Sequence, residues 1–259
     1  MAQGLCIWCR QPSEAAPPEH VIPEALGCPR HAVLVDCEVC AGCNHGFADV
    51  DQALEASLDV VKFVAGVRGK RGKAPTVSTR SNLRAGYRGG VPLVELNFGP
   101  GDIILPDGRR LKSPIGDPDA VHGELHVDRG RVTAKPRARV LHHPKCPRAL
   151  HKIALESIAL TLGRDAALDS RLDPVRAFAR HGDGPSRQVL FIKPRGWGYL
   201  NQLWPPYRSP DGYVVVFMLC GIEVVVDCTP AQTSVPHLRA LFASTYGDRG
   251  WSWIPLPEG

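Results

Sequence analysis

The residues with the clearest chemical potential are cysteines near the start of the chain. Cys6 and Cys9 form one CxxC pair, and Cys40 and Cys43 form a second. A two-residue spacer lets the chain turn while both sulfurs point inward, so two such pairs can place four thiolates around one tetrahedral Zn²⁺. Cys37 forms a nested CxxC with Cys40, and the spacing leaves open whether Cys37 replaces Cys43. Because Zn²⁺ with four thiolate ligands has no open position for substrate, we expect this metal to be structural.

Groups suited to catalysis lie between the two cysteine pairs and directly after them. Glu19 and His20 are adjacent in a short apolar stretch, and Asn44 follows the last cysteine. Carboxylate and amide oxygens are hard ligands suited to Mg²⁺ or Mn²⁺, and a neutral imidazole can remove a proton from water. One site can hold all three side chains. The sequence therefore predicts a second, exchangeable metal beside a general base.

The segments CIWC, EHVIPEALG and CAGCN, at these intervals, resemble the HNH endonucleases, in the branch whose ββα-metal fold is stapled by two CxxC knuckles. The resemblance covers roughly residues 5–55. It implies that His20 is the general base and that Glu19 and Asn44 bind the catalytic Mg²⁺ or Mn²⁺. It also implies hydrolysis of a DNA phosphodiester bond, in which the ion stabilises the leaving 3′ oxygen while His20 deprotonates the attacking water.

Two departures from the family pattern concern the loop after His20. The family usually has a second glycine where this chain has Cys28, and commonly an Asn or His in the second strand that braces the loop. Around that second position the chain offers His31 and Asp36, and the sequence does not choose between them. The residue that braces the loop is therefore left open.

Basic residues gather in the Gly-rich run GVRGKRGKAP. Arg68, Lys70, Arg71 and Lys73 lie there, and phosphate neutralisation by such side chains supplies most of non-specific DNA affinity. The net charge of +5 is compatible with a polyanionic partner. We expect DNA to be the partner and these four residues to contact it; the alternative interpretation is a solvated loop. A homodimer is a further expectation.

Hydrophobic spacing predicts the elements that must position these groups. Apolar residues recur at helical spacing from about residue 47 to 67, and Gly66 and Gly69 can end that helix. From residue 76 to about 140, short alternating stretches separated by Gly, Pro and Asp predict antiparallel strands. The first part therefore ends in one helix, and a run of hairpins follows it.

The period becomes helical again in the second half. A helix is expected from Pro147 to Gly163, and a shorter one after Asp173. Further strands and a last short helix are expected at residues 188–193, 213–219 and 222–228 and around 237–245. We therefore predict an α+β protein. A small zinc-stapled ββα-metal module spans residues 1–75, and a larger mixed antiparallel-sheet and helix domain spans 76–259 and serves target recognition or sensing.

The larger domain contains two weaker candidates for function. A second metal is one interpretation of a group of histidines with a cysteine, and a basic loop entering a helix is the other; these residues are His142, His143, Cys146 and His151. Aromatic residues in a Gly/Pro-rich stretch can stack on a base or plug a sheet; these are Trp197, Tyr199, Trp204 and Tyr207.

Composition favours a soluble cytoplasmic protein with no membrane partner. Hydrophobic residues make up 44% of the chain, and no apolar run approaches the roughly 20 residues of a membrane span. The start MAQGLCIWCRQ lacks the layout of a secretory signal, so we expect a reducing cytoplasm. There the nine cysteines of the chain favour metal binding or burial over disulfides. The function that we expect is a metal-dependent DNA endonuclease of restriction, phage-defence or mobile-element type. The alternative is a zinc-containing DNA-binding or regulatory protein with a degenerate HNH site.

Overall fold

The protein is an α+β fold built on antiparallel strand pairs, as seen in a computed structural model, and this confirms the predicted fold class. The structure describes residues 4–13, 16–35, 38–69, 72–75, 77–78, 83–88, 91–96, 100–104, 110–114, 123–128, 131–136, 141, 143–192, 201–247 and 251–254. Among the sequence-based candidates, Asp36, Cys37, Lys70, Arg71, His142, Trp197 and Tyr199 lie outside these residues.

The first part of the chain folds into two short hairpins followed by two consecutive α-helices. Its elements are β1 (Gly4–Leu5), β2 (Pro12–Ser13), β3 (Glu19–His20), η1 (Glu24–Leu26), β4 (Val33–Leu34), α1 (Ala41–Gly46) and α2 (Ala48–Val64). β1 pairs with β2, and β3 pairs with β4, both antiparallel. The pair β3–β4 followed by α1 gives the strand, strand, helix order, and α2 confirms the helix predicted over residues 47–67.

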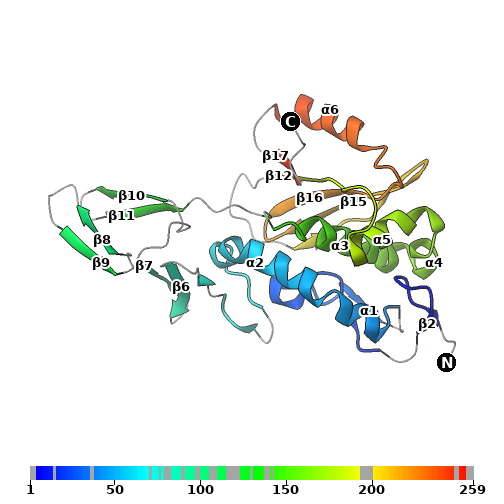
Figure 1. Ribbon diagram of the computed structural model, residues 1–259, viewed down its shortest axis with the longest axis horizontal. Helices are drawn as coiled ribbons and strands as arrows, with labels where there is room; N and C mark the ends of the chain where they lie inside the picture. The colour runs from blue at the N-terminus through cyan, green and yellow to red at the C-terminus, as the bar shows by residue number, and fades with distance from the viewer. Residues whose placement is uncertain are drawn as a thin grey trace.

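Hairpins follow α2 and confirm the strands predicted between residues 76 and 140. They are β5 (Val77–Ser78), β6 (Leu83–Arg88), β7 (Val91–Leu96), β8 (Pro100–Ile104), β9 (Arg110–Pro114), β10 (Gly123–Asp128) and β11 (Arg131–Pro136). The pairings are β5 with β6, β6 with β7, β8 with β9 and β10 with β11. In Figure 1 these strands lie to the left of the other elements.

The last part combines a helical layer with a six-stranded sheet. Its helical elements are α3 (Cys146–Leu162), α4 (Arg164–Ala167), η3 (Ser170–Leu172), α5 (Asp173–His181) and α6 (Val235–Tyr246). Its strands are β12 (Val189–Ile192), β13 (Gln202–Leu203), β14 (Tyr207–Ser209), β15 (Gly212–Leu219), β16 (Ile222–Asp227) and β17 (Trp251–Ile254). The order is β13-β15-β16-β12-β17, with β14 also on β15. The sequence analysis did not expect β13, β14 or β17.

α3 is the central helix of the protein, and Figure 1 shows it between α2 and the sheet. A proline in its first turn and Gly163 at its end begin and stop it as predicted. Almost all of its residues from Cys146 to Ala159 are buried, because neighbouring elements surround it. A helix that is buried all round has no solvent side, so its polar residues must find partners inside the protein.

One buried apolar cluster contains side chains from both sides of the predicted boundary at residue 75. Trp8, Phe47 and Leu54 come from the first part, and Ile153 and Phe217 come from α3 and β15. Part of the apolar surface of the first part is therefore buried only when α3 is in place. The independence of residues 1–75 and 76–259 stays a prediction.

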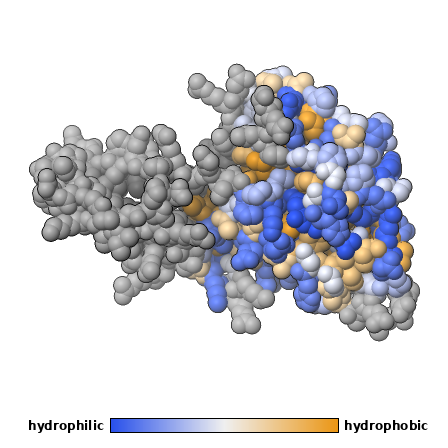
Figure 2. Space-filling view, in the orientation of Figure 1, coloured by the Kyte–Doolittle hydropathy of each residue, from blue (hydrophilic) through white to orange (hydrophobic). Residues whose placement is uncertain are grey.

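The face in Figure 2 carries mainly hydrophilic side chains where it is coloured, with hydrophobic patches between them. Within the described part of the chain, no helix combines the length and the apolar character needed to cross a membrane.

Candidate metal centre and its surroundings

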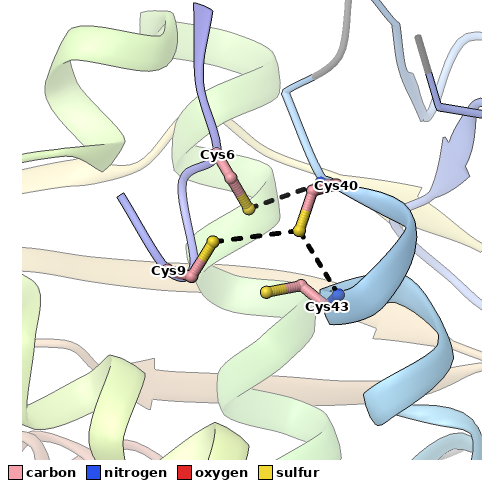
Figure 3. Close-up of side chains that lie close together, drawn as sticks. All are labelled: Cys6, Cys9, Cys40 and Cys43. Carbon is pink, nitrogen blue, oxygen red and sulfur yellow. Dashed lines mark hydrogen bonds between the residues drawn. The ribbon is translucent and has the colours of Figure 1, made fainter. Parts of the chain in front are cut away.

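Four cysteines from the two predicted pairs come together at one point. The sulfurs of Cys6, Cys9, Cys40 and Cys43 all lie within 4.8 Å of one another, and Figure 3 shows them converging. The Cys9 and Cys40 sulfurs are 3.8 Å apart. A Zn–S bond of about 2.3 Å places tetrahedral sulfurs about 3.8 Å apart, so the donor set and its spacing fit a zinc-like ion. The cluster contains Cys43.

The backbone around each pair explains why the sulfurs converge. The first pair lies in the turn of the β1–β2 hairpin, where the amide of Arg10 donates to the Cys6 carbonyl at 2.9 Å. Cys40 is the N-cap of α1, and its sulfur accepts from the Cys43 amide at 3.4 Å. The Cys40 amide in turn donates to the Cys6 sulfur at 3.4 Å, which joins the two pairs. Amide donors of this kind stabilise thiolates and therefore support metal binding.

Contacts between the crowded thiols shift the pKa values of Cys6 and Cys43 in opposite directions. A hydrogen bond from Cys43 lowers the pKa of Cys6 to about 4, and further donors outweigh the opposing effect of burial. The same contact and burial raise the pKa of Cys43. The Cys6 sulfur is therefore ready to be a thiolate, while the Cys43 sulfur needs a cation to lose its proton. A site with these properties releases protons when it takes up a metal.

Glu19, the predicted ligand of the catalytic ion, lies in a buried charge cluster. Its Oε1 is 2.7 Å from the Nζ of Lys152 on α3, and only 7% of its side chain is exposed. The same ammonium is 2.9 Å from Asp51 Oδ2 on α2 and 3.8 Å from Glu156 Oε2, four residues further along α3. The indole Nε1 of Trp8 donates to Glu156 Oε1 at 3.1 Å. The first knuckle, β3, α2 and α3 thus meet at this cluster.

The charges of this cluster support one another. Burial alone would lower the pKa of Lys152, but the carboxylates of Glu156, Asp51 and Glu19 raise it, and the net shift is upward. Burial raises the pKa of Glu156 well above its usual value. The lysine therefore keeps its charge, and burial drives Glu156 toward its neutral form.

His20 and Asn44 are both half-buried, on β3 and α1 respectively. Neighbouring residues of a strand point to opposite faces, so His20 does not share the buried face of Glu19. Phe47, at the end of α1 one turn after Asn44, lies with its ring 5.5 Å from Lys152 Nζ. β3 and the end of α1 therefore both adjoin Lys152. Among the described His, Cys, Asp and Glu residues, only the four cysteines converge as a metal-binding group.

Gly69, next to Arg68 in the basic run, lies beside the loop that follows His20. Arg68 and Lys73 are exposed, and Arg68 donates to the Gly72 carbonyl at 3.1 Å. A Cβ added at Gly69 would lie 3.2 Å from the carbonyl oxygen of Ala25 in η1, so the two segments touch. Of the two brace candidates, His31 is an exposed turn residue, and Asp36 lies outside the described residues.

Residues that the sequence analysis did not single out attach the last part of the chain to this module. The guanidinium of Arg176 on α5 donates to the Ile7 carbonyl at 2.7 Å, inside the first knuckle. The amide of Asn201 donates to the carbonyls of Leu26 at 2.5 Å and Gly27 at 2.9 Å. Both side chains are buried and bond to backbone carbonyls, an interaction that leaves no motif in a sequence.

The weaker candidates of the second half do not form a site among the described residues. Cys146 contacts Ser57 Oγ at 3.2 Å, and His151 Nδ1 lies 2.8 Å from the Pro147 carbonyl. Burial, together with nearby Arg187, lowers the pKa of His151 to about 3, so the ring is neutral. Of the aromatic residues, Trp204 is half-buried and Tyr207 is 61% exposed.

No protein-family model, no curated protein and no solved structure matches the chain.

Proposed function

We propose that the protein is a metal-dependent DNA endonuclease with His20 as general base and Zn²⁺ in the four-cysteine site. The observation that carries the proposal is the convergence of four thiols from the β1–β2 turn and the start of α1, because these elements flank the β3–β4 pair in the chain. Glu19 and His20 lie on β3, and Asn44 lies on α1. The resemblance of these segments to the HNH endonucleases supports the same function.

The residues divide the work by their chemistry. The half-buried imidazole of His20 can accept a proton from water, since its environment leaves it partly open to solvent. Glu19 and Asn44 offer the oxygen donors that Mg²⁺ and Mn²⁺ prefer, so the donor chemistry fits such an ion. When bound, the ion would polarise the phosphate and stabilise the leaving oxygen.

The position of the basic run supports DNA as the partner. Arg68 and Lys73 are exposed on a segment that touches η1, which follows His20 in the chain. DNA phosphates held there would lie beside the loop that follows the candidate base. Lys70 and Arg71 belong to the same proposal, as does a role in restriction, phage defence or a mobile element.

The Glu19–Lys152 pair favours a second candidate, a zinc-containing DNA-binding or regulatory protein without catalysis. An ammonium 2.7 Å from the carboxylate takes up one of its two oxygens, so only the other oxygen is left for a metal ion. The two candidates differ in one observable, because only the first breaks phosphodiester bonds.

A plasmid assay separates the two functions. Supercoiled DNA is incubated with the zinc-loaded protein and Mg²⁺ or Mn²⁺, beside His20→Ala and an EDTA control. His237→Ala is the matched control, because this histidine is exposed on α6. We expect cleavage by the wild type and by His237→Ala, and a loss of at least about 100-fold in His20→Ala, in the range for a removed general base. DNA binding without cleavage would favour the regulatory candidate, and cleavage by His20→Ala would contradict the choice of base.

A further inference from the structure

We propose that Lys152 is a positioning residue of the candidate nuclease site, whose ammonium holds the Glu19 carboxylate in place to bind the divalent ion. The inference rests on the proposed function and assigns a part of that site to α3, more than 130 residues along the chain from Glu19. It also means that residues 1–75 do not contain the complete site.

Burial restricts Lys152 to an indirect role. Only 1% of its side chain is exposed, so the ammonium cannot reach a DNA phosphate. Its Nζ instead lies 2.7 Å from Glu19 Oε1, which is the distance of a strong charge-assisted hydrogen bond. A group that touches only the ligand acts by orienting it.

Residues other than Glu19 also hold the ammonium of Lys152 in place. Glu156 lies 3.8 Å from the ammonium and is held by the indole of Trp8, whose ring in turn packs against Phe47 at a centroid distance of 4.6 Å. Asp51 supports the ammonium from α2 at 2.9 Å. Because the ammonium has partners on three elements, its position does not depend on Glu19 alone.

The local backbone around Glu19 is too short to fix its side chain. β3 has two residues, paired as Glu19 with Leu34 and His20 with Val33. An isolated hairpin of this size is marginal in water, so its position must come from tertiary contacts. Asn201 holds the carbonyls of Leu26 and Gly27 in the connecting loop, and Lys152 holds β3.

Neutralising Lys152 changes the affinity for the divalent ion in opposite directions under two interpretations of the contact. If Lys152 orients Glu19, neutralising the lysine weakens binding of the divalent ion, and such partners are typically worth 10–100-fold in affinity or activity. If the ammonium merely competes with the ion for the carboxylate, the same change tightens binding. The buried setting and the support from Glu156 and Asp51 favour orientation.

The test measures Mn²⁺ binding to the full-length, zinc-loaded protein by the electron paramagnetic resonance of free Mn²⁺. Glu156→Gln is the reference protein, since a glutamine keeps an acceptor for Trp8 and removes one buried acid. Lys152→Met in that background is the test variant. Lys145→Met is the matched control, because Lys145 also pairs with an aspartate of α2, Asp49, but at the surface. Zinc content and amide exchange of residues 16–35 are measured for each protein.

We expect Lys152→Met/Glu156→Gln to bind Mn²⁺ 10–100-fold more weakly than Glu156→Gln, with faster exchange in β3 and unchanged zinc. Lys145→Met should stay within twofold of wild type. Unchanged or tighter Mn²⁺ binding in the folded test variant would overturn the inference. If that variant does not fold, Lys152→Arg/Glu156→Gln takes its place; weaker Mn²⁺ binding is expected because the charge is displaced, and unchanged binding overturns the inference.

Glu19→Gln keeps this outcome separate from the proposed function. If Glu19→Gln binds Mn²⁺ more weakly than the wild type, but the wild type does not cut DNA, the nuclease function is refuted and the role of Lys152 stands. If Glu19→Gln binds Mn²⁺ as tightly as the wild type, the role of Lys152 is refuted, whether or not the wild type cuts DNA.

Discussion

Two clusters of acidic groups organise the first part of the chain, and each needs a positive charge at its centre. At Cys6, Cys9, Cys40 and Cys43 that charge has to come from outside, as a metal ion. At the second cluster the charge is the ammonium of Lys152, which the chain supplies itself. If a metal ion fills the first cluster, the fold depends on metal supply. The second makes the same module depend on α3, a helix from the other half of the sequence.

The largest effect is expected when one of the four clustered cysteines is replaced. Cys43→Ser should lose the bound zinc and destabilise the first part of the chain by several kcal/mol, since structural Zn²⁺ contributes an apparent 10–16 kcal/mol or so in zinc-finger peptides. Zinc content and thermal unfolding measure this. Cys28→Ser is the control, because its sulfur lies outside the four-cysteine cluster and donates to the Ala32 carbonyl at 3.2 Å, a bond that a hydroxyl keeps.

Cys37→Ser settles the alternative that the sequence left open. It should keep its zinc, because the converging sulfurs include that of Cys43. Retention of zinc in Cys43→Ser together with its loss in Cys37→Ser would assign the fourth ligand to Cys37 instead.

The two clusters also differ in how far a sequence can predict them. The cysteines were predicted because each pair is local. With only two residues between them, both ligands of a pair lie on one turn, and only the meeting of two turns had to be inferred. Lys152 and Glu156 were not singled out from the sequence. Their i,i+4 spacing is visible in the sequence, but their burial depends on α2, β3 and the sheet surrounding α3.

The same reasoning applies to the fold. Helix boundaries with local signals, such as the proline at the start of α3 and Gly163 at its end, were predicted. β17 was not, because four residues after a loop carry little periodicity until they pair with β12. Arg176 and Asn201 were also missed, since each recognises backbone carbonyls far away in the sequence.

Removing the internal cation should have the second largest effect. Lys152→Met leaves Glu19 and Asp51 beside Glu156 without a countercharge, and breaking a buried ion pair on one side typically costs about 3–5 kcal/mol. The free energy of unfolding in urea measures the loss. Glu156→Gln should cost less, because it removes a carboxyl that burial already drives toward its neutral form. A loss below about 1 kcal/mol in Lys152→Met would mean that the cluster is not a structural centre.

The smallest effect is expected where the same pairing is repeated in solvent. Lys145 is the N-cap of α3, and Lys152 lies in its first half. They pair with Asp49 and Asp51 respectively, which are two residues apart on α2. The exposed pair has its charged atoms 2.5 Å apart, closer than the buried pair, yet 39% and 57% of its side chains are exposed.

Lys145 lowers the pKa of Asp49 through this contact, so the stability it adds is present at neutral pH and is lost as pH falls through the acid range. Solvent screens most of it, and Lys145→Met should cost about 0–1 kcal/mol at pH 7. The difference from wild type should shrink further in 1 M NaCl, where the Debye length is about 3 Å. A cost in Lys145→Met equal to that in Lys152→Met would show that helix packing, and not burial of the charge, sets the energy of these pairs.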